Sequence, residues 1–203
     1  MTDDPTWSDY YEQNEGREPR ERLLDVLGSY DRAGRAIDLG CGAGIDTLAM
    51  LARGWDVFAT DEEPEAIDRL RARVPPDLRG RLATQVTPME EVELPEADLL
   101  LASFSLFFCD PGRFPDVWRR IGVALADGGR FVGELLGDRD TWAPERDISW
   151  FTEAEARALF EGWSIERFDE EDEDGEACSG PKHWHVFHVV ATSPPAGSPD
   201  APA

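Results

Sequence analysis

The sequence predicts an α/β domain in which helices cover both faces of a mostly parallel β-sheet. Short apolar runs that suit buried strands alternate with segments whose apolar residues recur at helical spacing, and this alternation is typical of parallel sheets. The 203 residues suffice for one well-buried core. We therefore expect a single domain over residues 1–191 and, because residues 192–203 are rich in Pro and Ser, a disordered C-terminal tail.

The first half of the chain repeats the order helix and strand. Leu23, Leu24 and Leu27 recur at helical spacing, so residues 19–27 predict an amphipathic helix before the first strand. The next predicted elements are a strand at 35–39, a helix at 45–52, a strand at 55–60, a helix at 64–73 and a strand at 82–87. Gly54 marks the end of one helix and Pro64 opens the next.

The second half continues the pattern and ends in an antiparallel pair. Residues 98–104 are nearly all apolar, as in a strand covered on both faces, and a helical stripe follows from Phe114 to Leu125. Thr152 and Glu155 have the spacing of a capping box. The predicted elements after the stripe are a turn at 127–129, a strand at 130–135, a helix from 152 to about 161, and strands at 163–168 and 183–191.

An acidic run, DEEDEDGE at residues 169–176, separates the last two predicted strands. Self-repulsion favours a solvated loop there, joining two antiparallel strands. A site for a divalent cation is the alternative, but adjacent acids alone specify no coordination geometry.

Composition excludes several classes of function. The 43 acidic and 20 basic residues give a formal charge of −23, which would repel the phosphate backbone of a nucleic acid. No signal sequence and no apolar stretch of about 20 residues is present, so we expect a cytoplasmic protein without a membrane partner. The 3 cysteines form no Cys-x-x-Cys pair, which argues against a disulfide framework and against a metal site.

Three glycines at alternate positions follow the first strand in AIDLGCGAG, residues 36–44. A glycine turn before a helix lets a polar ligand approach the backbone and the free amide hydrogens. A dinucleotide fingerprint would need a glycine where Ile45 stands, so the spacing disfavours a pyrophosphate. Asp61 ends the second strand, where a carboxylate can accept hydrogen bonds from ribose hydroxyls, and an adenosine-containing ligand is therefore expected.

At these residues the sequence resembles the class I S-adenosylmethionine (SAM)-dependent methyltransferases. AIDLGCGAG looks like their first motif, and DVFATD looks like their acidic second strand. WSDYYEQNEGREPR, SFSLFFCDP and KHWHVFHVV are similar to a group of small bacterial members often called tellurite-resistance-like. The resemblance implies a Rossmann-like, seven-stranded, mostly parallel sheet with a C-terminal antiparallel strand. It also implies SAM as methyl donor, S-adenosylhomocysteine (SAH) as product and a small-molecule acceptor.

The resemblance further implies which residues hold the donor. Residues 1–17 would form a lid segment, the glycine turn would pack on the methionine part and ribose, and Asp61 would hold the ribose. Asp38 would reach the amino group, Arg20 the carboxylate, and Met89 the adenine ring. The implied donor-binding residues are Arg20, Asp38, Gly40, Cys41, Gly42, Gly44, Asp61, Glu62, Met89, Glu90 and Ser103.

The acceptor side is less constrained. Trp142 and Trp150 are candidates to pack on an apolar or cationic acceptor, and Phe104 and Phe107 are the other candidates for acceptor binding, with Phe104 expected in the passage between SAM and the acceptor. Aromatic residues at such positions also serve packing alone. Because a sulfonium is already a strong methyl donor, no catalytic group is required. If the acceptor must lose a proton, the candidate bases are Tyr10, Tyr11, His183 and His185. On a strand, His183, His185 and Phe187 would share one face and His188 would lie on the other.

Two alternative functions remain at this point. One is a SAM-binding module without turnover, which the absence of an obvious base suggests. The other is an NAD-dependent oxidoreductase, which the glycine spacing disfavours. Neither the methyl-accepting atom nor the oligomeric state can be read from the sequence, because fold and donor site do not determine the acceptor.

Overall fold

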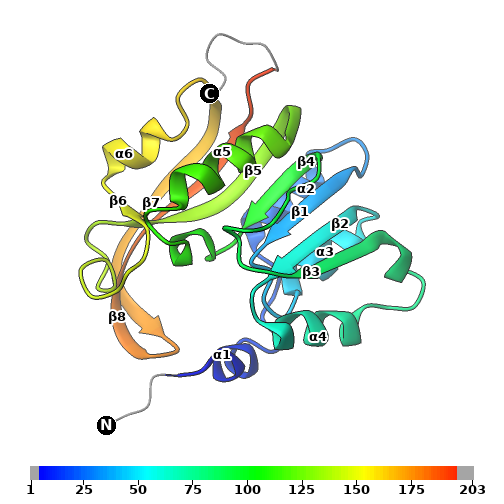
Figure 1. The fold of residues 1–203 in the computed structure, drawn as a ribbon, viewed down its shortest axis with the longest axis horizontal. Helices are drawn as coiled ribbons and strands as arrows, with labels where there is room; N and C mark the ends of the chain where they lie inside the picture. Colours follow the sequence, from blue (N-terminus) through cyan, green and yellow to red (C-terminus); the bar gives the residue numbers. More distant parts are fainter. Residues whose placement is uncertain (1–4, 196–203) are drawn as a thin grey trace.

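One mixed β-sheet with helices on both faces organises the computed structural model, which describes residues 5–195 (Figure 1). The main strand order is β3-β2-β1-β4-β5-β8-β7, and β6 pairs with β5 outside this path. The helices are α1 (Trp7–Gln13), α2 (Glu21–Gly28), α3 (Ile45–Ala52), α4 (Pro64–Arg73), α5 (Phe114–Ala124) and α6 (Glu153–Ala158), with 3-10 turns η1 (Arg79–Arg81) and η2 (Leu106–Phe108). The strands are β1 (Arg35–Leu39), β2 (Asp56–Asp61), β3 (Leu82–Val86), β4 (Ala97–Ala102), β5 (Leu125–Gly137), β6 (Trp150–Phe151), β7 (Ser164–Ala177) and β8 (Gly180–Thr192).

The strand order creates a crevice beside β1. From β1 the chain crosses to β2 and β3 on one side, then returns to place β4 on the other side of β1. All of these strands are parallel, so their carboxyl ends lie at the same edge of the sheet. In open α/β sheets, ligands bind in the crevice where the strand order reverses in this way.

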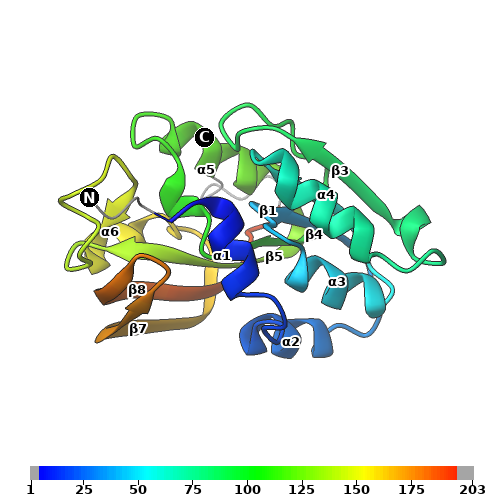
Figure 2. The same cartoon turned by 90° about the horizontal axis from the view of Figure 1, so that it is seen from below.

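Alternate side chains of each strand feed two hydrophobic cores, one on each face of the sheet. On one face, Leu23 of α2 and Met50 of α3 pack with Val57 and Leu99. On the other face, residues of α5 and α6 pack with Ile37, Leu100 and other strand residues. Figure 2 shows α2 and α3 on one side of the sheet and α5 on the other. The predicted two-sided α/β fold is confirmed.

Most predicted elements are present, with changed ends. The helix at 64–73 and the strand at 35–39 have the predicted bounds. β5 begins at Leu125 rather than at Arg130, because the turn at 127–129 interrupts the register within the strand instead of preceding it. The sequence patterns did not predict α1 or β6, since both are short and neither has a clear apolar periodicity.

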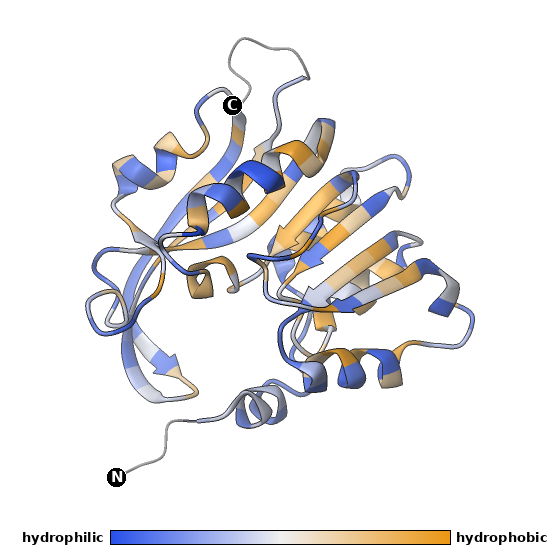
Figure 3. Cartoon of the chain, in the orientation of Figure 1, coloured by the Kyte–Doolittle hydropathy of each residue, from blue (hydrophilic) through white to orange (hydrophobic). Residues whose placement is uncertain are grey.

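The acidic run at residues 169–176 forms part of a strand, and the predicted loop is wrong. The run belongs to β7 and pairs antiparallel with residues 181–188 of β8. Figure 3 shows the contrast between this hydrophilic strand and the more apolar central strands. The basic side chains that pair with its carboxylates are Arg22, Arg139, Arg167, His183, His185 and His188. These pairs offset the self-repulsion that favoured a loop when the run was considered alone.

The cation-site alternative for the same run has a partial geometric basis. Glu170, Asp172 and His185 place one ligand atom each within 4.8 Å of one another. However, Arg139 Nη2 already donates to a Glu170 oxygen at 2.5 Å and to an Asp172 oxygen at 2.7 Å. The guanidinium therefore supplies the positive charge that these carboxylates need.

Two further expectations concern the ends of the chain and the membrane. Within residues 5–195, no helix is long and apolar enough to cross a membrane. The predicted tail begins at Thr192, which is the last residue of β8. Residues 196–203, like residues 1–4 of the predicted lid, lie outside the described part of the chain.

Candidate active site

A cavity of about 1420 Å³ opens at the carboxyl ends of β1, β2 and β4, at the crevice that the strand order creates. Helix α1 runs across its mouth, as seen from below the sheet in Figure 2. The glycine turn after β1 forms one wall, and the segment after β4 together with the end of the β7–β8 hairpin forms the opposite wall. The cavity thus extends between two regions that the sequence assigned to donor and acceptor.

The three glycines of the turn have different roles. All have positive φ angles, which favour glycine: 77° at Gly40, 52° at Gly42 and 81° at Gly44. A Cβ at Gly40 would lie 2.4 Å from the Ser105 Cβ, and one at Gly44 would lie 2.3 Å from the Leu70 Cδ1. A Cβ at Gly42 would meet only the Tyr11 ring, at 3.6 Å. Gly40 and Gly44 therefore permit close packing within the fold, whereas Gly42 faces the cavity.

Asp61 joins the end of β2 to this turn. One carboxylate oxygen accepts a hydrogen bond from the Gly42 backbone N–H at 2.8 Å, and the other accepts from the Glu63 N–H at 3.0 Å. Burial raises the pKa of Asp61 despite these bonds. A carboxylate can accept about four hydrogen bonds, so Asp61 keeps capacity for a ligand. Glu62 also lines the cavity, and burial and the Asp61 charge raise its pKa.

Asp38 is a buried carboxyl group at the end of β1. Only 2% of the residue is exposed, yet it borders the cavity. Burial raises its pKa to about 7, although the Thr47 hydroxyl donates a hydrogen bond to it. A carboxylate so removed from water attracts a cationic group strongly. This property suits the ammonium group of an amino-acid ligand.

Asp46, which the sequence analysis missed, ties the segment before α2 to the first turn of α3. One Asp46 oxygen accepts from Arg17 Nη2 at 2.7 Å and the other accepts from the Arg20 backbone N–H at 2.8 Å. The Arg20 guanidinium lies 4.4 Å from the Phe104 ring centroid, and its buried Nε has no hydrogen-bond partner. Arg20 therefore lines the cavity, and its Nε–H is available to donate a hydrogen bond to a ligand. The sequence did carry a signal for Asp46, because an acidic residue in the first turn of the helix after the glycines is typical of a helix N-terminus.

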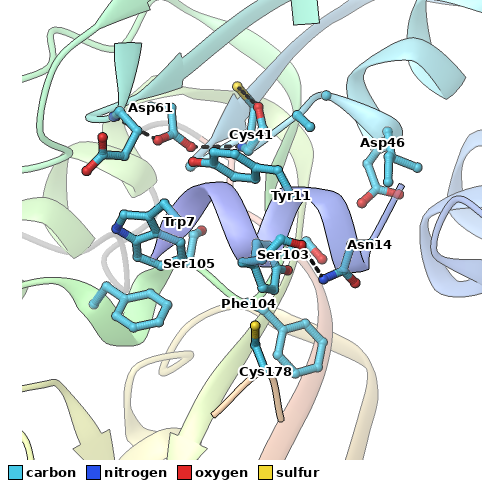
Figure 4. Close-up of a pocket in the computed structure, with 18 of the residues that line it drawn as sticks. Trp7, Tyr11, Asn14, Cys41, Asp46, Asp61, Ser103, Phe104, Ser105 and Cys178 are labelled. Atoms are coloured by element: carbon cyan, nitrogen blue, oxygen red, sulfur yellow. Dashed lines mark hydrogen bonds between the residues drawn. The ribbon is translucent and has the colours of Figure 1, made fainter. Parts of the chain in front are cut away.

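Helix α1 covers the glycine turn with aromatic side chains. A capping box between Thr6 and Asp9 fixes its first turn. Tyr11 is buried against Gly42, and its ring lies beside the turn in Figure 4. Burial, followed by the Asp61 charge, raises the pKa of Tyr11, and burial raises that of Tyr10. Both phenols line the cavity, but they stay neutral and are poor candidates for a base.

Met89 and Glu90 follow β3 and line the cavity as expected for an adenine-binding segment. Arg120 holds this segment in place, since its Nη2 donates to the backbone carbonyls of Met89 at 3.1 Å and Glu90 at 2.8 Å. The Glu90 carboxylate accepts from the Asp110 N–H at 2.9 Å. The Met89 side chain is partly buried against the core.

Phe104 has an unusual backbone conformation at the end of β4. Its φ of 53° is the only positive value among the non-glycine residues that the structure describes. The buried Glu134 carboxylate accepts a hydrogen bond from the Phe104 N–H at 2.9 Å, and His188 lies 3.4 Å from the other Glu134 oxygen. Such strain persists where surrounding contacts over-determine it, and here it directs residues 103–105 toward the cavity.

Three sequence-based candidates do not line the cavity. Trp150 is 44% exposed on β6, which pairs with the carboxyl-terminal end of β5. His183 and His185 lie on the other face of β8 and pair with carboxylates of β7. The alternation along β8 instead brings Trp184 and His188 to the cavity. The predicted separation of His188 from the other two histidines is thus correct, but the two catalytic candidates are on the wrong face.

All other predicted site residues line this one cavity. They are Tyr10, Tyr11, Arg20, Asp38, Gly40, Cys41, Gly42, Gly44, Asp61, Glu62, Met89, Glu90, Ser103, Phe104, Phe107 and Trp142. Burial raises the pKa of the Cys41 thiol, which stays protonated. Residues that the sequence analysis missed include Trp7, Asp46, Phe108, Arg146, Trp184 and His188.

Comparisons with known proteins agree with this geometry. The methyltransferase-domain family matches residues 36–129, which contain the glycine turn and Asp61. A magnesium-protoporphyrin O-methyltransferase of Rhodobacter capsulatus is 39% identical over 107 residues, which cover 51% of this chain and 46% of that protein. The chain thus spans about half the length of the curated relatives it matches.

Solved structures share the fold over nearly the whole chain. TehB from Haemophilus influenzae has a TM-score of 0.74 at 16% identity, covering 93% of this chain and 67% of that one. Magnesium protoporphyrin IX methyltransferase from Synechocystis PCC 6803 with bound SAH has a TM-score of 0.69 at 10% identity, covering 92% and 93%. At these identities the likeness establishes the fold alone.

Proposed function

We propose that this protein, whose residues 36–129 match the methyltransferase-domain family, is a class I SAM-dependent methyltransferase that acts on a small molecule. One observation carries the proposal. The glycine turn, Asp61 and the buried Asp38 meet at one end of a cavity whose other end is aromatic and has no assigned ligand. Donor and acceptor would therefore bind side by side.

The residues present fit the donor, and each part of SAM has a matching group. Asp61 has lone pairs left for the ribose hydroxyls, and Asp38 attracts the ammonium group. The unpaired Arg20 Nε and the neighbouring Arg17 suit the carboxylate. Met89 suits the adenine ring. When bound, SAM supplies a methyl group on a positively charged sulfur, which an acceptor can displace in line.

The chain would contribute mainly by placing the acceptor and excluding water. The lid segment, residues 1–17, includes α1, whose Tyr11 already covers the turn. The opposite wall is largely apolar, so closure would leave a dry site in which a nucleophile is held against the methyl group. Tyr10 and Tyr11 have raised pKa values and are not expected to take a proton from the acceptor. We propose that residues 1–191 act as one such domain.

The match to a magnesium-protoporphyrin methyltransferase supports a small-molecule acceptor in general terms. It does not identify the acceptor, because the matched part is about half of that protein. A cytoplasmic location and the absence of nucleic-acid partners stay predictions from charge and composition.

Isothermal titration tests the donor site directly. We expect SAM and SAH to bind in a one-to-one complex and NADH not to bind. Tight NADH binding without SAM binding would instead favour the oxidoreductase. As a matched pair, Asp61→Ala should weaken SAH binding while Trp150→Leu, which lies outside the cavity, should not.

A second experiment tests turnover. SAM with a labelled methyl group is incubated with the protein and a panel of small acceptors that carry amine, hydroxyl, thiol or carboxylate groups. A labelled product that requires Asp61 supports the proposal. Tight SAM binding without any labelled product favours the SAM-binding module without turnover.

A further inference from the structure

A continuous aromatic surface begins at α1, at the mouth of the cavity, and extends along the wall opposite the glycine turn. We call it the aromatic wall and define it as Trp7, Phe104, Phe108, Trp142 and Trp184, all of which line the cavity. Successive ring centroids lie 5.2 Å apart for Trp7 and Phe108, 6.3 Å for Phe108 and Trp142, 5.7 Å for Trp142 and Trp184, and 6.0 Å for Trp184 and Phe104. Four elements or loops far apart in sequence supply these rings. In the view of Figure 4, Phe104 lies across from Asp61 and Cys41, with Tyr11 and Trp7 of α1 between them.

The size of the cavity leaves room for this surface to bind a second ligand. Pockets for one small ligand usually measure about 300–1,000 Å³. The volume of about 1420 Å³ exceeds this range, and Arg20 is the proposed donor residue that lies on a ring of the wall. The aromatic wall is therefore the place for the acceptor.

Cations already lie on the rings of the wall. The Lys182 Nζ is 3.5 Å from the Trp142 ring centroid and 4.0 Å from that of Trp184, and it is buried in an ion pair with Asp140. The Arg146 guanidinium is 4.4 Å from the Trp142 centroid, and that of Arg20 is 4.4 Å from the Phe104 centroid. The two guanidinium groups bring positive charge to the wall and would repel a cationic acceptor.

Arg146 adds an anion-binding group at the rim. It is exposed and lines the cavity, and its guanidinium is paired with no carboxylate in the part of the chain that the structure describes. About half of the arginines in the described region have such a partner, and Arg146 belongs to the half whose guanidinium is available to a ligand. Arg20, the other unpaired guanidinium at the wall, is needed for the carboxylate of the donor. Arg146 is thus left for the acceptor.

We infer that the acceptor is a planar aromatic or conjugated anion, which stacks on the aromatic wall and pairs its anionic group with Arg146. The inference rests on the proposed function, because it assigns the donor to the opposite end of the cavity. It replaces the sequence-based expectation that the tryptophans bind an apolar or cationic acceptor. The site would select an anionic acceptor over a neutral or cationic one through the charge of Arg146, and a planar acceptor over a non-planar one through the rings of Trp142 and Trp184.

Binding of four probes to the SAH-saturated protein tests the inference. The probes are naphthalene-2-carboxylate, its neutral carboxamide, the cationic 2-naphthylmethylammonium, and the non-aromatic cyclohexanecarboxylate. Quenching of tryptophan fluorescence or calorimetry gives the dissociation constants. We expect the aromatic carboxylate to bind about tenfold more tightly than each other probe, the ordinary contribution of one charged hydrogen bond or one stacked ring.

Matched variants locate the effect. Arg146→Met should remove the preference for carboxylate over carboxamide, whereas Arg79→Met, outside the cavity, should not. Trp142→Leu should weaken both aromatic probes, and Trp150→Leu should weaken neither. Because Arg146 is exposed, its variant should fold normally.

The outcomes separate this inference from the proposed function. Equal affinity for carboxylate, carboxamide and ammonium probes, or an unchanged preference in Arg146→Met, overturns the inference even if SAH binds. Failure of SAH to bind counts against the donor site instead. The same titrations without SAH then still decide whether the wall selects aromatic anions.

Discussion

The buried carboxyl group of Asp38 should make the stability of the protein depend on pH. Because burial raises its pKa from 3.8 to about 7, this carboxyl group stabilises the fold when protonated, and that contribution is lost as the pH rises from about 4 toward 7. Asp38→Asn keeps an acceptor for the Thr47 hydroxyl and removes the buried charge. We expect the variant to be more stable than the wild type at pH 8, by an amount on the order of a few kcal/mol at most. Denaturant unfolding at pH 5 and pH 8 measures the difference.

The same substitution should weaken donor binding, because the ionised form is the one that pairs with an ammonium group. In the wild type, SAM affinity should fall about tenfold or more from pH 7 to pH 5, as the carboxylate takes up a proton. In Asp38→Asn this fall should be largely absent. A wild-type affinity that does not change across this range would contradict the role of Asp38.

Asp61 is a second residue whose contacts make a specific expectation. Asp61→Ala removes the acceptor of two backbone N–H groups and the proposed acceptor for the ribose hydroxyls. SAH affinity should fall at least about tenfold, since hydrogen bonds to charged groups contribute about 1.5–3 kcal/mol each. Calorimetry measures the affinity, and Asp61→Asn, which keeps one oxygen, should lie between the variant and the wild type. A folded alanine variant with wild-type affinity would refute the role.

At the scale of elements, two glycines of the same turn have different roles: Gly44 permits packing within the fold, and Gly42 faces the cavity. Gly44→Ala would place a methyl group 2.3 Å from the Leu70 Cδ1, so it should lower the melting temperature by several degrees. Gly42→Ala meets only ordinary contact with Tyr11 and costs about 1 kcal/mol from its positive φ. It should therefore fold but bind SAH more weakly, and Gly42→Val more weakly still. Thermal melts and calorimetry on both alanine variants compare the two effects.

The β7–β8 hairpin should have a stability optimum in pH. Neighbouring carboxylates raise the pKa values of His183 and His188, so their contributions are lost as the pH rises above the ordinary value of about 6.5. Hydrogen bonds from His185 and Arg139 lower the pKa of Glu170, and hydrogen bonds from Arg139 and His183 lower the pKa of Asp172. The stability that these two carboxylates contribute is therefore lost in acid. Hydrogen exchange should show the largest opening free energy between about pH 5 and 6. His183→Asn should reduce the loss of opening free energy at alkaline pH. An unchanged pH profile would argue against a stabilising pair between His183 and the carboxylates of β7.

For the whole molecule, net charge should dominate the response to salt. The charge of −23 acts across the surface, and NaCl shortens the distance over which carboxylates repel one another. Salt also screens the surface ion pairs, but exposed pairs contribute only about 0–1 kcal/mol each. We expect the melting temperature to rise when the NaCl concentration is raised from about 0.05 M to about 1 M. A melting temperature that falls instead would show that the ion pairs outweigh the repulsion.

The sequence by itself determined the glycine turn and the meeting of Asp38, Gly42 and Asp61 at one edge of the sheet. Glycine spacing and the acid at the end of the next strand are local patterns, and parallel strands bring their carboxyl ends to one edge in any such fold. Asp38, Gly42 and Asp61 could therefore be placed before the cavity was known. The same reasoning predicted β1 and α4 with correct bounds.

Only the tertiary structure decided the face of β8 that lines the cavity, the strand character of the acidic run and the composition of the aromatic wall. Alternation places His183 and His188 on opposite faces but cannot say which face meets the cavity. The acidic segment of β7 can form a strand because Arg139 and the histidines of β8 neutralise its carboxylates. Each of these outcomes depends on partners distant in the chain, and local sequence patterns carry no record of such pairs.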